Sequence, residues 1–191
     1  VTISFTKIIL ISIRPGTETL GKLPGTEMFC DTAQYPMAVK IPGVMIIRVK
    51  SALFCFANAN FVRERIVRWI TAQKAADTKG QTKDKEAIHL VILDMSSGAQ
   101  YDFLEIHNFF PFPCMPDLIN IDTSGIATLE ELQKNLISEG IELAVANPRW
   151  QVIHKLKLSN FVGKIGGRVF VTVGEAVDAS FGGKFATACE C

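Results

Sequence analysis

The sequence predicts an α/β fold in which a mostly parallel central sheet is flanked by helices. Short apolar runs, typical of strands, alternate with longer segments whose apolar residues recur at helical spacing. Because parallel neighbours need a crossover connection, this alternation favours a parallel sheet joined by helices. The composition supports a folded domain, since 48% of the 191 residues are hydrophobic and 20% are charged.

The first strands of this domain are predicted at residues 44–49 and 53–57, and the first of these runs contains several β-branched residues. A helix then extends to about Ala76, because apolar residues recur on one of its faces. These residues are Val62, Ile66, Trp69 and Ile70. Either Asn58 or Asn60 has a side chain that can cap the start of this helix.

The later segments continue the alternation. A nearly continuous apolar run at residues 88–95 predicts a strand that is buried on both faces. A helix that ends at Gly140 is followed by another buried strand at residues 141–146. Asn147 is a suitable cap for the next helix, and Pro148 suits its first position. Two elements complete the order: a strand at residues 168–171 and a helix at residues 175–181.

Both ends of the chain differ from this domain, which we place at residues 43–183. Residues 1–14 begin with about thirteen mostly apolar residues interrupted by Lys7, fewer than the roughly 20 that a membrane helix needs. Taken alone, this stretch fits a strand, a buried helix or the cytosolic end of a membrane helix. Prolines and glycines interrupt residues 15–42, where we expect an irregular linker. Residues 184–191 are expected to form a loose tail.

The sequence shows no pattern typical of a metal site or an enzyme. The cysteines are odd in number, five, and none has CxxC spacing, which argues against a zinc site or a disulfide framework. The histidines His89, His107 and His154 lack the spacing of metal ligands. Residues 163–167 (GKIGG) lack the Lys-Ser/Thr ending of a phosphate loop and are interpreted as a turn. We therefore expect no catalytic residues, no metal and no cofactor.

Several long strings resemble the STAS domain, a fold shared by sulfate-transporter tails and bacterial anti-sigma-factor antagonists. IHLVILDMSS at 88–97 and NIDTSGIATLEELQKNL at 120–136 resemble the family's central strand and its Asp-Ser/Thr-Ser-Gly signature. GIELAVANPRWQVIHKLKLSNFV at 140–162 resembles the corresponding part of plant sulfate transporters. VTISFTKIILISIRPGTETLGKLPGT at 1–26 does so too. The resemblance implies that residues 1–14 are the end of the last transmembrane helix.

One segment departs from the family pattern. The family passes almost directly from the first of these strings to the second, whereas an insertion at about residues 98–116 separates them here. It contains FFPFPCMP, whose closely spaced prolines exclude a central strand or a helix. Two interpretations remain open: a surface loop, or intron sequence that has been translated. The second is based on the pyrimidine-rich codons of phenylalanine and proline, which resemble the sequence before a splice acceptor.

The resemblance implies a cytosolic regulatory and interaction domain of a proton-coupled sulfate transporter in a membrane. Its expected partners are the transmembrane domain of the parent transporter and a cytosolic protein, and a homodimer is a further expectation. Nucleic acid is not an expected partner, because the formal net charge is only +1 and no basic stripe is present. The alternative is a free-standing phospho-switch protein of the anti-sigma-factor antagonist type.

The candidate switch is the motif formed by Asp122, Thr123, Ser124 and Gly125 at the start of a helix. Helix starts have unpaired N–H groups and partial positive charge, so they accommodate a phosphate. By resemblance to the antagonists, Thr123 is the phosphoacceptor, and Asp122 orients its hydroxyl or holds the local turn. Gly125 would let a partner approach closely. Alternatively, the Asp, Thr and Ser residues are helix caps without a switch function.

A second candidate surface is formed by Arg63, Arg65 and Arg68, which lie largely off the buried face of the predicted helix. Arginines in this arrangement are typical of a solvated helix face. They would also suit a contact with anionic lipid or with the membrane part of the transporter.

Overall fold

The structure is a computed structural model that describes residues 13–51, 53–78, 87–96 and 120–182, and it confirms the predicted α/β class. Within these residues the central sheet has six strands in the order β2-β1-β3-β5-β7-β8. Four neighbours are parallel: β3 (Val44–Lys50), β5 (Leu90–Asp94), β7 (Glu142–Ala146) and β8 (Val169–Phe170). β1 (Gly16–Lys22) is antiparallel to β3 and to β2 (Phe29–Asp31).

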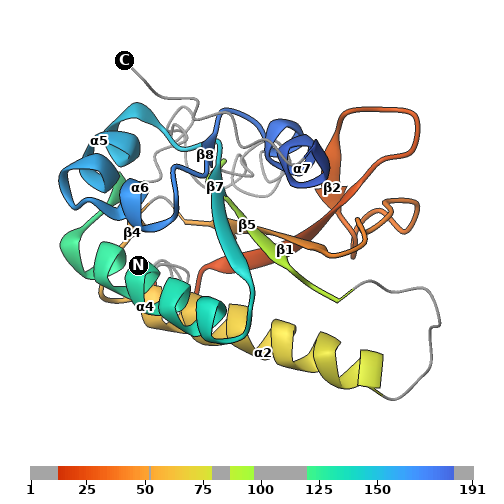
Figure 1. Cartoon of the computed structure of the whole chain (residues 1–191), viewed down its shortest axis with the longest axis horizontal. Helices are drawn as coiled ribbons and strands as arrows, with labels where there is room; N and C mark the ends of the chain where they lie inside the picture. The colour runs from red at the N-terminus through yellow and green to blue at the C-terminus, as the bar shows by residue number, and fades with distance from the viewer. Residues whose placement is uncertain (1–12, 52, 79–86, 97–119, 183–191) are drawn as a thin grey trace, which may run out of the picture.

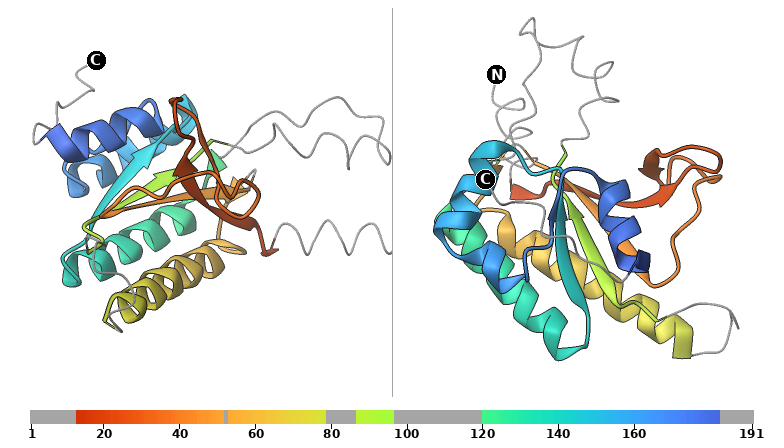
Figure 2. Two further views of the ribbon diagram at one scale, coloured as in Figure 1. Left: turned by 90° about the vertical axis from the view of Figure 1, so that its right-hand side faces the viewer. Right: turned by 45° about the horizontal axis from the view of Figure 1, so that its top comes forward.

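Helices cover both faces of the sheet (Figure 1). The two longest described helices, α2 (Ala59–Thr78) and α4 (Thr123–Ser138), lie on one face, and α7 (Val173–Gly182) lies on the other. Figure 2 shows these three layers most clearly in its left-hand view. The short helices α5 (Trp150–Leu158) and α6 (Phe161–Lys164) connect β7 to β8 and pack into the core on the α2–α4 face.

The strands at the centre of the sheet are buried on both faces. In β3, Met45, Ile47 and Val49 share one hydrophobic cluster with α2 and α4, whereas Val44 and Ile46 share another with α7. Successive side chains of a strand point to opposite faces, so a strand covered on both sides must be apolar at nearly every position. This is why the continuous apolar runs predicted β3, β5 and β7 correctly.

The prediction of an irregular linker at residues 15–42 is wrong for two stretches, which form β1 and β2. β1 pairs with β3 over five residues of register, from Gly16 opposite Lys50 to Leu20 opposite Ile46. A Cβ atom at Gly21 would lie 2.9 Å from the Val39 carbonyl oxygen. Glycine is therefore needed where Val39 pairs with the end of β1 at Lys22. Two of the glycines that suggested a linker, Gly16 and Gly21, are therefore strand residues.

One other boundary differs from the prediction. The expected strand at 53–57 is only β4 (Leu53–Phe54), which pairs with β6 (Asn120–Ile121) in a separate two-stranded parallel sheet. Asn58 lies directly before α2, at the N-cap position: its carbonyl oxygen accepts from the Val62 N–H (3.0 Å), and its Oδ1 accepts from the Cys55 N–H in the preceding turn (3.0 Å). The helix end at Gly140 is confirmed, and Gly140 has positive φ. The turn predicted at residues 163–167 is confirmed for 165–167, whereas Gly163 and Lys164 belong to α6.

Three predictions concern residues that lie wholly or mostly outside the described ones. They are the membrane-helix end at residues 1–14, of which only Ile13 and Arg14 are described, the insertion at about 98–116 and the tail at 184–191. Among the helices of the described residues, none has the length and apolar character required to cross a membrane.

Candidate functional site

The four residues of the predicted switch lie together at the first turn of α4. Asp122 is the N-cap of this helix, and its Oδ1 accepts a hydrogen bond from the Gly125 N–H at 2.6 Å. The Asp122 N–H donates to the Phe54 carbonyl oxygen at 3.1 Å, which ties the start of α4 to β4. Asp122 therefore caps the helix and holds the turn that presents Thr123.

The hydroxyl-bearing residues of the motif are open to solvent. The side chains of Thr123 and Ser124 are both exposed, and they occupy the first two positions of α4. This end of the helix carries the partial positive charge of the macrodipole, and no acidic residue lies in the first turn. The two hydroxyls thus lie at the positive end of the helix, beside the carboxylate of the N-cap Asp122.

Gly125 has a packing function that the sequence did not indicate. It is buried, and a Cβ atom there would lie 2.5 Å from the Phe54 carbonyl oxygen and 2.9 Å from Ile121 Cγ1. The close approach is thus made by Phe54 of the same chain, not by a partner protein. Glycine at this position lets the first turn of α4 lie directly against β4 and β6.

Lys155 of α5 is a further charged residue beside the switch motif. Its Nζ donates hydrogen bonds to Asn120 Oδ1 and to the Ile121 carbonyl oxygen, both at 2.8 Å. The lysine therefore supports β6, the strand that leads into Asp122, and brings a positive charge to it. Sequence reasoning missed this residue, because the contact joins segments about 35 residues apart and no local pattern marks it.

The three arginines of α2 do not form one cluster. The Nη1 atom of Arg63 lies 2.7 Å from Glu131 Oε1 on α4. The guanidinium of Arg65 lies over the rings of Phe61 and Trp69, at 6.0 and 5.2 Å from their centroids. Arg68 is exposed. The predicted contact of these arginines with lipid or with a membrane domain remains a prediction.

A second polar group lies at the carboxyl ends of the central strands, around the fully buried Asp94 at the end of β5. One carboxylate oxygen accepts from Arg48 Nε (2.8 Å) and Ser96 Oγ (2.9 Å). The other accepts from the Ser96 N–H (2.9 Å) and Asn147 Nδ2 (2.8 Å). These hydrogen bonds link β3, β5 and the end of β7 across the sheet.

The prediction that Asn147 caps the next helix is wrong. Its φ of 54° is left-handed, α5 begins only at Trp150, and Arg149 occupies the N-cap position. Asparagine tolerates this backbone conformation better than most residues. The conformation accompanies the contact of its side chain with Asp94, so Asn147 belongs to the buried network.

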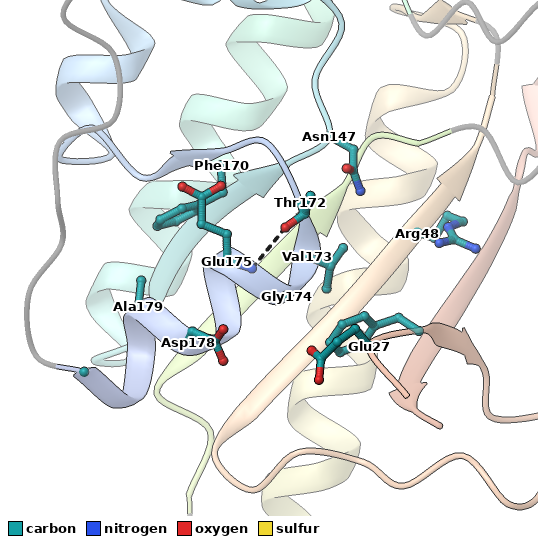
Figure 3. Close-up of a pocket in the computed structure, with 12 residues that line it drawn as sticks. Glu27, Arg48, Asn147, Phe170, Thr172, Val173, Gly174, Glu175, Asp178 and Ala179 are labelled. Carbon is teal, nitrogen blue, oxygen red and sulfur yellow. Dashed lines mark hydrogen bonds between the residues drawn. The ribbon is translucent and has the colours of Figure 1, made fainter. Parts of the chain in front are cut away.

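An open cavity of about 820 Å³ lies beside this network (Figure 3). Arg48 and Asn147 lie at one end, Glu27 lies on one side, and the first turns of α7 lie on the other. Phe29 and Phe170 also line the cavity. Glu175 is committed to the start of α7, because its Oε2 accepts from the Val171 N–H (3.0 Å) while its N–H donates to Thr172 Oγ1 (3.1 Å). No group of His, Cys, Asp or Glu suited to hold a metal ion occurs within the described ranges.

Comparison with known families identifies the chain. A family model for the STAS domain matches residues 35–104 and 114–176, which include the switch motif and the buried network. The chain belongs to the STAS domain family. The match to this STAS domain omits residues 105–113, which fall within the insertion predicted at about 98–116.

Plant sulfate transporters are among the relatives of this STAS domain. It is 54% identical over 183 residues to Sulfate transporter 2.1 of Arabidopsis thaliana, covering 95% of this chain and 24% of that protein. It is 50% identical over 185 residues to Low affinity sulfate transporter 3 of Stylosanthes hamata, covering 96% of this chain and 25% of that protein. The chain thus spans about a quarter of the length of these relatives.

A solved structure shows the same fold. The murine Slc26a9 anion transporter in its inward-facing state aligns with a TM-score of 0.66 at 20% sequence identity. The alignment covers 95% of this chain and 25% of that transporter. The STAS domain fold is therefore present within a much longer membrane transporter.

Proposed function

We propose that this STAS domain is the cytosolic regulatory domain of a proton-coupled sulfate transporter. The observation that carries the proposal is the 54% identity to Sulfate transporter 2.1 over 95% of this chain. The transport path would lie in a membrane part outside this chain, and the STAS domain would modulate transport through contacts with that part. Both of the plant relatives compared above are named as sulfate transporters, which supports a role in transport over a catalytic one.

The site that we propose for this regulation is the exposed start of α4. Asp122 and Gly125 fix the backbone there, through the N-cap hydrogen bond and the packing against Phe54. Thr123 is left exposed at the positive end of the helix. Asp122 and Gly125 thus hold the turn, while the Thr123 hydroxyl remains accessible. This arrangement suits a hydroxyl that a kinase modifies or a partner contacts.

A chimaera tests the proposed parent. The matching residues of Sulfate transporter 2.1 would be replaced by this chain, and uptake of radiolabelled sulfate would be measured in yeast cells that lack their own sulfate transporters. We expect uptake that increases as the external pH falls, because protons would be co-transported. A chimaera that reaches the membrane in normal amounts but takes up no sulfate would contradict the proposal.

Thr123→Ala tests the switch in the same chimaera. We expect sulfate uptake to fall by at least about fivefold, the lower end of typical coupling between sites. The isolated chain should keep its stability within about 0.5 kcal/mol, because an exposed side chain is removed. Thr71→Ala, at an exposed threonine of α2, is the matched control. Normal uptake by the Thr123 variant would show that the residue is only part of a helix start.

A further inference from the structure

The cavity beside Asp94 has the size and the lining of a site for a small organic molecule. Its volume of about 820 Å³ lies within the usual range for such sites, roughly 300 to 1,000 Å³. It lies outside the carboxyl ends of β3 and β7, between α7 and the segment that contains Glu27 (Figure 3). The regulation proposed above for Thr123 uses none of the lining residues. Their side chains are therefore free to bind a ligand of another kind.

Arg48 presents a fixed positive group to this cavity. Its Nε donates to Asp94 (2.8 Å), and Asp94 is itself held by Ser96 and Asn147. The two Nη atoms of Arg48 have no hydrogen-bond partner among the described residues, although the side chain is only 17% exposed. Such a guanidinium can donate two parallel hydrogen bonds to a carboxylate. Because Asp94 already orients it, little side-chain entropy is lost when a ligand binds.

Asn147 adds a hydrogen-bond acceptor at the same end of the cavity (Figure 3). Its Nδ2 donates to Asp94 (2.8 Å), so the amide is oriented and Oδ1 remains as an acceptor. No donor to this oxygen occurs in the part of the chain that the structure describes. A guanidinium and a free amide oxygen at one end can bind the carboxylate and the ammonium of one α-amino acid. A sulfate or a phosphate would use only the guanidinium.

The other charged residues of the lining are acidic. Glu27 lies on one side of the cavity and Asp178 of α7 on the other (Figure 3). The Glu27 carboxylate reaches toward α7, since a Cβ atom at Gly174 would lie 4.0 Å from its Oε2. Lys22 offsets Glu27 in an ion pair (2.9 Å), whereas Asp178 and Glu175 have no ion-pair partner within the described ranges. The excess of negative charge attracts a cation and repels a phosphate.

We propose that this cavity binds a cationic α-amino acid. Its carboxylate accepts from the Nη atoms of Arg48, its α-ammonium donates to Asn147 Oδ1, and its side-chain cation lies beside Asp178. The methylene groups of the ligand contact the apolar part of the lining, which consists of Phe29, Phe170, Val173 and Ala179. The inference goes beyond the proposed function, because the site is built from residues of this chain alone.

Isothermal titration calorimetry of the 191-residue chain with L-lysine tests the site. Two analogues each remove one charged group: L-norleucine lacks the side-chain ammonium, and cadaverine lacks the carboxylate. We expect L-lysine to bind at least about tenfold more tightly than either analogue, the usual effect of one charged hydrogen bond. Cadaverine that binds as tightly as L-lysine would overturn the inference. Saturable binding of sulfate or ATP, with none of L-lysine at millimolar concentration, would overturn it as well.

A pair of matched variants locates the binding. Asp178→Asn should weaken L-lysine binding at least about tenfold and leave the weaker binding of L-norleucine unchanged, because only the side-chain cation loses its partner. Glu64→Gln, at an exposed carboxylate of α2 on the opposite face of the sheet, is the control and should change neither. Circular dichroism spectra should stay unchanged, since both side chains are exposed.

Equal affinities of the Asp178 and Glu64 variants for L-lysine would show that the cation does not lie in this cavity, and the inference would fall. The calorimetry uses this chain without the chimaera. A negative result therefore leaves the proposed parent standing, and a chimaera that takes up no sulfate leaves the amino-acid site standing.

Discussion

Replacing Asp94 by leucine should lower the free energy of unfolding by about 3 kcal/mol, the lower end of the range for breaking a buried ion pair. Leucine has the same number of side-chain heavy atoms as aspartate but accepts no hydrogen bonds, so Arg48 Nε, Ser96 and Asn147 Nδ2 lose their shared acceptor. The loss stays at the lower end because the side chain of Arg48 is 17% exposed and can still reach water. Urea unfolding of the isolated chain measures the change.

Two control variants separate the buried pair from ordinary charge effects. Glu139→Gln removes a partner of Lys74 in a surface ion pair, and should cost less than about 1 kcal/mol. Adding Arg48→Met to Asp94→Leu should recover part of the lost stability, because the unpaired buried charge is then gone. A loss for Asp94→Leu as small as that for Glu139→Gln would show that the network contributes little.

The sequence predicted the central strands well because burial on both faces leaves a direct pattern. β3, β5 and β7 each read as nearly continuous apolar runs, and the helices between them showed apolar residues at helical spacing. The pattern failed for β1, which includes two glycines, Gly16 and Gly21, and the half-buried Glu18 and Thr19. A strand that pairs near the edge of a sheet needs fewer apolar residues, so β1 shows no continuous apolar run. Its glycines were then the clearest local signal, and they suggested a linker.

The candidate site divides in the same way into local and non-local parts. The N-cap at Asp122 could be predicted, because a cap depends on residues three positions apart. The network around Asp94 could not, since Arg48 and Asn147 are 46 and 53 residues away from it. One aspartate at the end of an apolar run has no local sign that a cation and an amide from neighbouring strands will surround it.

Gly125 illustrates a residue whose type was noticed but whose role needed the fold. Within a helix, glycine is normally a weak choice, and its replacement by alanine stabilises by roughly 0.5 to 1 kcal/mol. Here Gly125→Ala should destabilise the domain by about 1 to 3 kcal/mol, the usual cost of overpacking. The added Cβ would lie 2.5 Å from the Phe54 carbonyl oxygen, which is backbone and cannot rotate away.

The sign of the change makes this prediction decisive. Gly174→Ala is the matched control, because this glycine also lies in the first turn of a helix and its Cβ would meet only ordinary contacts at 3.9 Å or more. We expect thermal unfolding to show a lower melting temperature for Gly125→Ala and an equal or higher one for Gly174→Ala. Stabilisation by both substitutions would mean that α4 can move away from β4 at little cost. Thr123 would then be presented by a flexible helix start, and a regulatory role for its fixed position would lose its structural basis.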